Sequence, residues 1–393
     1  MPIYFGKQPN QRSSSGSGDR MLLLIKWLVI LGAASYLAIG LYLYVTGTND
    51  DLNRRWREAG YWLQGYDPIQ VAHTGTPVLS QYGPMFPEGG YPPWAYVYAL
   101  LVAPPILPFQ AVKVWFSILN GAAIVALGYI VKRAYRGPGT SEQWPFLYAA
   151  ALCSLAVPVA LRHHQYGILV TVLLWASLYF EAEGQPFWAG LSLAFAFIKP
   201  QTAALFFLLP LARSSFRSCL WCVMVLLVAT GIAAWRCSTW PWVMLSEILN
   251  TGVSNGFYLG IGDPLKNFIG RKSLLLASIA LFVPLVFALL SKWRTAPLYQ
   301  LAAIPAVFST LWMNHRPHDL MIVSLLVVPL LSLAFEKRSS RLVIIAGVVG
   351  LAYWFPHLAR FYEEAYFWPV PLLFRVIWLF GLFCLLEPTI KAS

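Results

Sequence analysis

Two adjacent acids and one isolated lysine are the residues of this chain whose types and positions could do chemistry. Asp50 and Asp51 follow the first long apolar run, in a chain that holds 16 acidic residues among 393. Lys199 stands alone in the apolar stretch AFIKPQT, beside Pro200. Ionisable groups at membrane depth are costly unless paired or hydrated, so they indicate function. A carboxylate suits a general base, and a buried ammonium suits a phosphate.

The acid Asp51 also has a structural interpretation. The segment NDDLNRRWREAGYWL begins with helix-capping residues and then places Trp56, Ala59 and Leu63 at the spacings of an amphipathic interfacial helix. Periodicity alone favours a helix cap over a base. For Lys199 the alternative is a side chain that snorkels, but the neighbouring proline predicts a helix break that faces a cavity, which favours a functional lysine.

Two polar turns carry further candidates. The turn RHHQYG holds Arg162, His163, His164 and Gln165. Adjacent histidines do not project to the same side of a helix, so the pair gives little support for a metal site. Hydrogen bonding to phosphate or sugar and a plain interfacial turn both stay open.

The second turn, MNHRPHDL, opens a late apolar run. It holds His315, His318 and Asp319. The neighbouring histidine and aspartate could orient one another or bind phosphate. A polar connection between two helices is the alternative, and the residues alone do not decide between them.

The composition indicates an all-α polytopic membrane protein. Hydrophobic residues make up 58% of the chain and charged residues 11%, and apolar runs long enough to cross a bilayer recur from residue 21 to 386. The net charge of +12 is spread over short basic clusters between these runs. Such clusters mark cytoplasmic loops, so the charge indicates topology and not a nucleic-acid partner.

The basic clusters give a threading of the chain. We expect a disordered cytoplasmic tail over 1–20, then one integral membrane domain over 21–393 with both termini cytoplasmic and about twelve crossings, some of them short or broken. We place outer loops at 46–92, with amphipathic helices, and at 236–271. Prolines divide residues 91–131 into a re-entrant or surface-lying segment over 93–106 and a crossing over 109–131.

This threading gathers the unusual polar residues at one boundary. The outer ends of the predicted spans hold the two acids, both polar turns and the apex of the broken hairpin: Asp50, Asp51, His163, His164, Gln165, Lys199, His315, His318 and Asp319. The sequence therefore predicts that side chains far apart in the chain meet outside the cytosol.

An ordered set of short motifs resembles the glycosyltransferase family 87 enzymes of the GT-C superfamily. An acid follows the first span, and a Gly-x-Asp-Pro, a Tyr-Pro-Pro, a glutamine turn, an Ala-Gly helix ending in Ile-Lys-Pro and a late His-Asp come after it. Here they read Asp51, GYDPI at 65–69, YPPW at 91–94, HHQYG at 163–167, AGLSLAFAFIKP at 189–200 and HDLMIV at 318–323. Each motif is weak alone, but their order is moderately specific.

The resemblance implies a membrane glycosyltransferase that uses a polyprenyl-phosphate sugar donor, such as a phosphomannose, and a lipid-linked or glycan acceptor, with inversion. By position, Asp51 matches the presumed base and Asp50 is the fallback, because the usual Asp-Phe pair is Asp-Leu here. The turn usually reads Gly-Gln-x-Asn, and HHQYG departs from it. Expected donor-phosphate contacts are Lys199, His318, Arg162, His163 and His164, and expected substrate contacts are Gln165, Tyr91, Asp67, Asp319 and His315.

We therefore expect activity at the outer face of a bacterial plasma membrane, among membrane lipids and with no cofactor or metal required. Two other functions fit parts of the sequence. A lipid-linked oligosaccharide polymerase or ligase also works outside on polyprenyl carriers, but it takes a diphosphate donor. A lipid or sugar transporter or flippase would suit broken helices with Lys199 at the apex, although no inverted repeat is visible.

Overall fold

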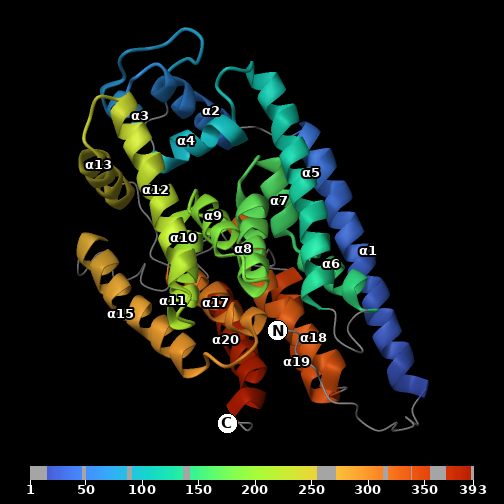
Figure 1. The fold of residues 1–393 in the computed structure, drawn as a ribbon. Coiled ribbons are helices and arrows are strands. Elements are labelled where there is room, and N and C mark those ends of the chain that lie inside the picture. Colours follow the sequence, from blue (N-terminus) through green and yellow to red (C-terminus); the bar gives the residue numbers. More distant parts are fainter. Residues whose placement is uncertain are drawn as a thin grey trace.

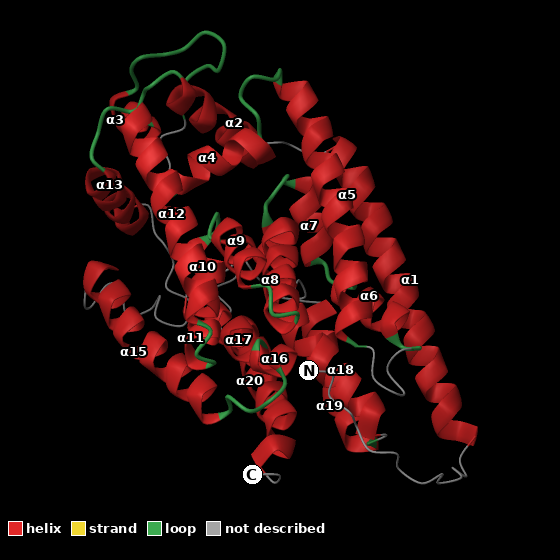
Figure 2. Ribbon diagram, in the orientation of Figure 1, coloured by secondary structure: helices red, strands yellow, loops and turns green. Residues whose placement is uncertain are grey.

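The computed structural model describes residues 16–46, 50–85, 91–135, 142–254, 271–312, 317–337, 339–354 and 369–390. The regular structure in these ranges is helical, and the pairing of Leu79 with Gly83 is an isolated bridge (Figure 2). The all-α fold class predicted from the sequence is confirmed.

The N-terminal half contains the long helices α1 and α5 and a set of shorter helices between and after them. They are α1 (Gly16–Thr46), α2 (Asp50–Leu63), α3 (Pro68–Thr74), α4 (Pro93–Val102), α5 (Phe109–Ala134), α6 (Trp144–Leu152), α7 (Ala156–Arg162), α8 (Gly167–Ala182) and α9 (Pro186–Ala196).

The C-terminal half continues with α10 (Pro200–Ala203), η1 (Ala204–Phe207), α11 (Leu208–Ala212), α12 (Phe216–Arg236), α13 (Pro241–Ser254), α15 (Arg271–Lys292), α16 (Leu298–Leu301), α17 (Ala303–Trp312), η3 (Pro317–Val323), α18 (Ser324–Lys337), α19 (Ser340–Trp354) and α20 (Pro369–Ile390).

The helices make the protein a multi-pass membrane protein. Among the described residues, 5 helices are long and apolar enough to cross a bilayer, and 6 if α6 and α7, which meet at a bend of 55°, form one span. Other apolar helices have 10–17 residues, too short to cross about 30 Å at 1.5 Å per residue without thinning or protein cover. The count of about twelve crossings therefore stays a prediction.

The helices that follow α1 gather at one end of the bundle. Figure 1 shows α2, α3 and α4 together at the end opposite to α20. The predicted amphipathic helix is confirmed: α2 buries Leu52, Trp56 and Ala59. Two indole groups hold α2 against the rest of the bundle. Trp56 donates a 3.0 Å hydrogen bond to the Leu107 carbonyl, and Trp62 donates a 3.1 Å hydrogen bond to the Ala233 carbonyl.

The predicted helix break at Lys199 is also confirmed. Helix α9 ends at Ala196 and α10 begins at Pro200, with Lys199 in a non-helical conformation between them. Proline has no N–H to continue the helical ladder, which leaves carbonyl groups of α9 to find other donors. The Phe197 carbonyl accepts a 2.8 Å hydrogen bond from the Trp94 indole of α4, so α4 helps to hold the break in place.

Two boundaries differ from the sequence-based prediction. Helix α1 begins at Gly16, inside the tail predicted over 1–20; residues 1–15 lie outside the described ranges. The outer loop predicted over 236–271 contains α13. At the start of this helix Trp240 and Trp242 are exposed and stacked, with ring centroids 4.8 Å apart. Tryptophan side chains, which combine an apolar ring with a polar N–H group, are typical of a membrane–water interface.

The packing of α9 on α12 generates a first prediction. A Cβ at Gly190 would lie 2.4 Å from the Ser218 carbonyl oxygen and 2.7 Å from the Trp221 Cβ, whereas one at Gly231 would meet nothing within 4 Å. We expect Gly190→Ala to destabilise the protein by about 1–3 kcal/mol through overpacking. Gly231→Ala, the matched control on α12, should leave the midpoint of thermal unfolding in detergent unchanged or higher. Equal midpoints for the two variants would contradict this packing.

Candidate functional site

A buried lysine joins three segments that are far apart in the chain. Lys199 is 2% exposed, and its Nζ lies 2.6 Å from Asp319 Oδ1 and 3.0 Å from Gln165 Oε1. The lysine comes from the break between α9 and α10, the glutamine from the turn before α8, and the aspartate from η3. Because an unpaired charge is expensive in the interior, the ammonium requires these partners. We call these three residues the lysine cluster.

A glycine permits the three segments to approach. A Cβ at Gly167 would lie 2.1 Å from the His318 carbonyl oxygen, so only glycine lets η3 rest on the first turn of α8. Just before it the chain turns at His164, whose φ is 51°. From this turn Gln165 reaches Lys199, whereas the ring of His164 lies against Tyr44.

The histidine His318 lies beside the lysine cluster. Its Nε2 is 3.7 Å from Asp319 Oδ1, and both side chains are buried. The carboxylate of Asp319 thus faces two groups that can carry positive charge. With His318 protonated, the three groups would carry a net charge of +1, which suits an anionic ligand.

The acid Asp51 lies within electrostatic range of this group. It occupies the first turn of α2, and its charge interacts with Lys199, Arg55 and Tyr91. Asp50 is the first residue of α2, and its side chain lies outside the described part of the structure. The chain therefore places one described carboxylate of the outer loop within electrostatic reach of the buried lysine.

A buried ion pair on the same helix was not predicted from the sequence. Arg55 donates a hydrogen bond to Glu58, and its guanidinium carbon lies 3.6 Å from the ring centroid of Tyr91. Burial raises the pKa of the Glu58 carboxyl above its ordinary value, although Arg55 opposes that shift. The signal in the sequence was the spacing of Asp51, Arg55 and Glu58 at i, i+4 and i+7, which puts all three on one face of a helix.

The other residues predicted for the phosphate lie in different surroundings. His164 is 1% exposed and its ring centroid is 4.0 Å from that of Tyr44. Burial, with Lys113 nearby, lowers the pKa of His164 to about 4, so this imidazole is neutral at pH 7. Arg162 is exposed at the end of α7, and His163 is half-buried. Their roles as phosphate ligands stay predictions.

The remaining predicted substrate residues differ in their contacts. Asp67 caps α3 by accepting a 2.9 Å hydrogen bond from the Ile69 N–H. Tyr91 packs edge-on against Tyr166, with ring centroids 5.9 Å apart. His315 lies outside the described residues. In the described ranges no group of three or more His, Cys, Asp or Glu side chains is arranged to hold a metal ion.

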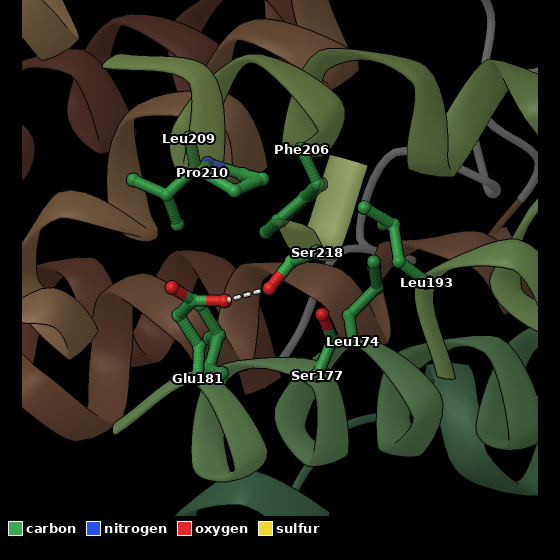
Figure 3. Close-up of a pocket in the computed structure, with 9 residues that line it drawn as sticks. Leu174, Ser177, Glu181, Leu193, Phe206, Leu209, Pro210 and Ser218 are labelled. Atoms are coloured by element: carbon green, nitrogen blue, oxygen red, sulfur yellow. Dashed lines mark hydrogen bonds between the residues drawn. The ribbon is translucent and has the colours of Figure 1, made fainter. Parts of the chain in front are cut away.

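A hollow of about 330 Å³ opens between α8, α9, α11 and α12. Figure 3 shows its apolar lining and the carboxylate of Glu181, which accepts a 2.5 Å hydrogen bond from the Ser218 hydroxyl. Glu181 is in the last turn of α8, whereas Gln165 precedes the first turn. At 1.5 Å per residue the two lie about 20 Å or more apart along the helix, so this hollow is separate from the lysine cluster.

The lysine cluster generates a stability prediction. Removing one partner of a buried ion pair leaves an uncompensated charge and typically costs about 3–5 kcal/mol. We expect Lys199→Met and Asp319→Asn each to lower the midpoint of thermal unfolding strongly. The double variant should lose much less than the sum of the two, as a double-mutant cycle would measure. Additive losses would show that the two charges do not depend on each other.

The sequence was compared with known protein families, curated proteins and solved structures. The model of glycosyltransferase family 87 matches residues 90–313, which is more than half of the chain. No curated protein and no solved structure matches. The matched region contains the helix break with Lys199 and the turn with Gln165, while Asp51 and Asp319 lie on either side of it. The chain belongs to glycosyltransferase family 87 and is a membrane glycosyltransferase.

Proposed function

We propose that the protein transfers a monosaccharide from a polyprenyl-phosphate donor to a lipid-linked or glycan acceptor, with inversion, at the outer face of a bacterial plasma membrane. The observation that carries this proposal is the meeting of Lys199, Gln165 and Asp319, with His318 and Asp51 near them. One carboxylate and two potential cations in one buried place are what such a transfer requires.

The phosphate of the donor is the ligand that the cations would recognise. A polyprenyl phosphate brings its charge to the membrane boundary, where a preformed cation stabilises the leaving group without reorganising. Lys199 is already paired with Asp319, so the phosphate would share that cation, and His318 would supply the second one. Gln165 would keep the ammonium in place while its partners change.

The reaction needs a base on the opposite side of the sugar. The acceptor hydroxyl oxygen forms a bond to the anomeric carbon as the bond from that carbon to the phosphate oxygen breaks. The proton passes to the carboxylate of Asp51, and the polyprenyl phosphate leaves with the electron pair. Attack opposite the leaving group inverts the anomeric centre, and the transition state resembles an oxocarbenium ion.

The sidedness of the site follows from charge distribution. Basic clusters end several helices, including Lys132 and Arg133 at the end of α5 and Lys337 at the end of α18. By the positive-inside rule these ends face the cytoplasm. Helices α2, α3 and α4 and the start of α5 then lie on the outer side, together with Asp51 (Figure 1).

The proposal predicts the effect of neutralising the acid. Asp51→Asn should lower the turnover of a synthetic polyprenyl-phosphate sugar by purified protein about 10²–10⁴-fold, the usual contribution of a general base. Thermal unfolding of the variant should stay near that of the wild type, because Asp51 is only partly buried.

Asp50→Asn is the matched control and should retain turnover. Loss in that variant with activity in Asp51→Asn would assign the base to the neighbouring acid. Turnover only with a diphosphate-linked oligosaccharide would favour a polymerase or ligase. Wild-type protein that moves the lipid across vesicles but transfers no sugar would favour a flippase.

A further inference from the structure

The buried cations around the proposed donor site are paired with carboxylates of the protein. Lys199 and Asp319 are 2% and 5% exposed, and Arg55 and its partner Glu58 are 8% and 2% exposed. Water and salt screen such enclosed pairs much less than they screen pairs at the surface. The protein itself therefore cancels much of the positive charge that a ligand would meet here.

The two ion pairs belong to one electrostatic neighbourhood. The guanidinium carbon of Arg55 lies 3.6 Å from the ring centroid of Tyr91. The Tyr91 phenol interacts with the charges of Lys199, Asp319 and Asp51. A ligand charge placed beside Lys199 would thus interact with the whole group and not with the lysine alone.

Among the described residues, the charges of this neighbourhood balance. The positive members are Lys199, Arg55 and Arg54, and the negative members are Asp319, Asp51 and Glu58. His318, beside Asp319, adds one positive charge when it is protonated. These groups together therefore present a net charge between zero and +1 to a ligand.

This balance distinguishes two kinds of lipid-linked donor. A sugar joined through one phosphate carries a single negative charge on its phosphodiester, whereas a sugar joined through a diphosphate carries two. A net charge of +1 neutralises the first donor but leaves one uncompensated charge on the second, which is costly away from water. Asp319 has the most direct influence on this balance, because it faces both Lys199 and His318.

We propose that Asp319 is a specificity-determining residue, which limits the positive charge of the donor site to what one phosphodiester needs. Its carboxylate holds Lys199 in place and reduces the attraction of that ammonium for a second negative charge. The proposal rests on the proposed function and deepens it, because it names the residue that would separate a phosphate-linked donor from a diphosphate-linked one.

The test uses two lipids that differ by one charge. One is farnesyl methyl phosphate, and the other is farnesyl methyl diphosphate with the methyl group on the distal phosphate. The methyl group stands in for the sugar and fixes the two charges near pH 7. Farnesol is the uncharged lipid. Dissociation constants are measured on purified protein in one detergent at one pH and one salt concentration, and the readout is the ratio of the two constants.

We expect wild type to bind the phosphodiester more tightly than the diphosphate. Asp319→Asn should shift the ratio toward the diphosphate by about tenfold, the effect of one unit charge nearby in partly buried surroundings. Gln165→Glu, which puts a further carboxylate beside Lys199, should shift the ratio by about tenfold the other way. Glu181→Gln is the matched control, because it removes a carboxylate at the opposite end of α8, and it should leave the ratio unchanged.

The outcomes separate this proposal from the proposed function. An unchanged ratio in folded Asp319→Asn or in Gln165→Glu overturns the charge limit and leaves the phosphate site standing, as does an equal shift in Glu181→Gln. If Asp319→Asn yields no folded protein, Gln165→Glu decides, because it keeps the ion pair. If neither charged lipid binds wild type more tightly than farnesol does, the proposed donor class fails and the charge limit fails with it.

Discussion

The buried ion pair between Lys199 and Asp319 is the constraint on which the rest of the structure depends. The two charges are 2.6 Å apart and almost fully covered, so neither can be left alone without a large cost. Their residues are 120 positions apart in the chain. Satisfying this pair therefore requires the break after α9, the close approach at Gly167 and the 3₁₀ segment η3, all in one place.

The same pair shapes the chemistry that the site can do. A lysine that is already neutralised by Asp319 attracts an anion less than a free ammonium would, and Gln165 takes a further N–H of that group. Additional positive charge has to come from His318, beside the same carboxylate.

Periodicity and composition predicted much of the fold, since they depend on residues close in sequence. The amphipathic helix after Asp51, the break at Lys199 and the division of residues 91–131 into a short and a long helix are all present. The pairing of Lys199 with Asp319 was not foreseen. Sequence reasoning gave the two residues separate ligands, because contacts across 120 positions leave no local pattern.

The residues that sequence reasoning missed share one physical reason. Arg55 and Glu58 are charged residues on an amphipathic helix and look like a solvated face, yet α2 buries them against α4. Tyr96 and Tyr166 stand in apolar runs and look like packing. Burial of a polar group is a tertiary property, so only the assembled helices show which polar side chains are enclosed.

The broken helices explain how such polar groups reach membrane depth at all. Helix α1 is largely exposed on the outside of the bundle, whereas the span from His318 to Lys337 is 89% buried. A backbone break in lipid would leave carbonyl groups without donors, but inside protein other side chains can supply them. Trp94 does so at the break after α9, and the Tyr353 hydroxyl and Trp354 indole do so for the Ala151 and Ala150 carbonyls at the end of α6. Helices on the outside of the bundle, such as α1, thus contact the lipid. The enclosed helices can be broken and can carry charged side chains, because neighbouring protein groups supply their hydrogen-bond partners.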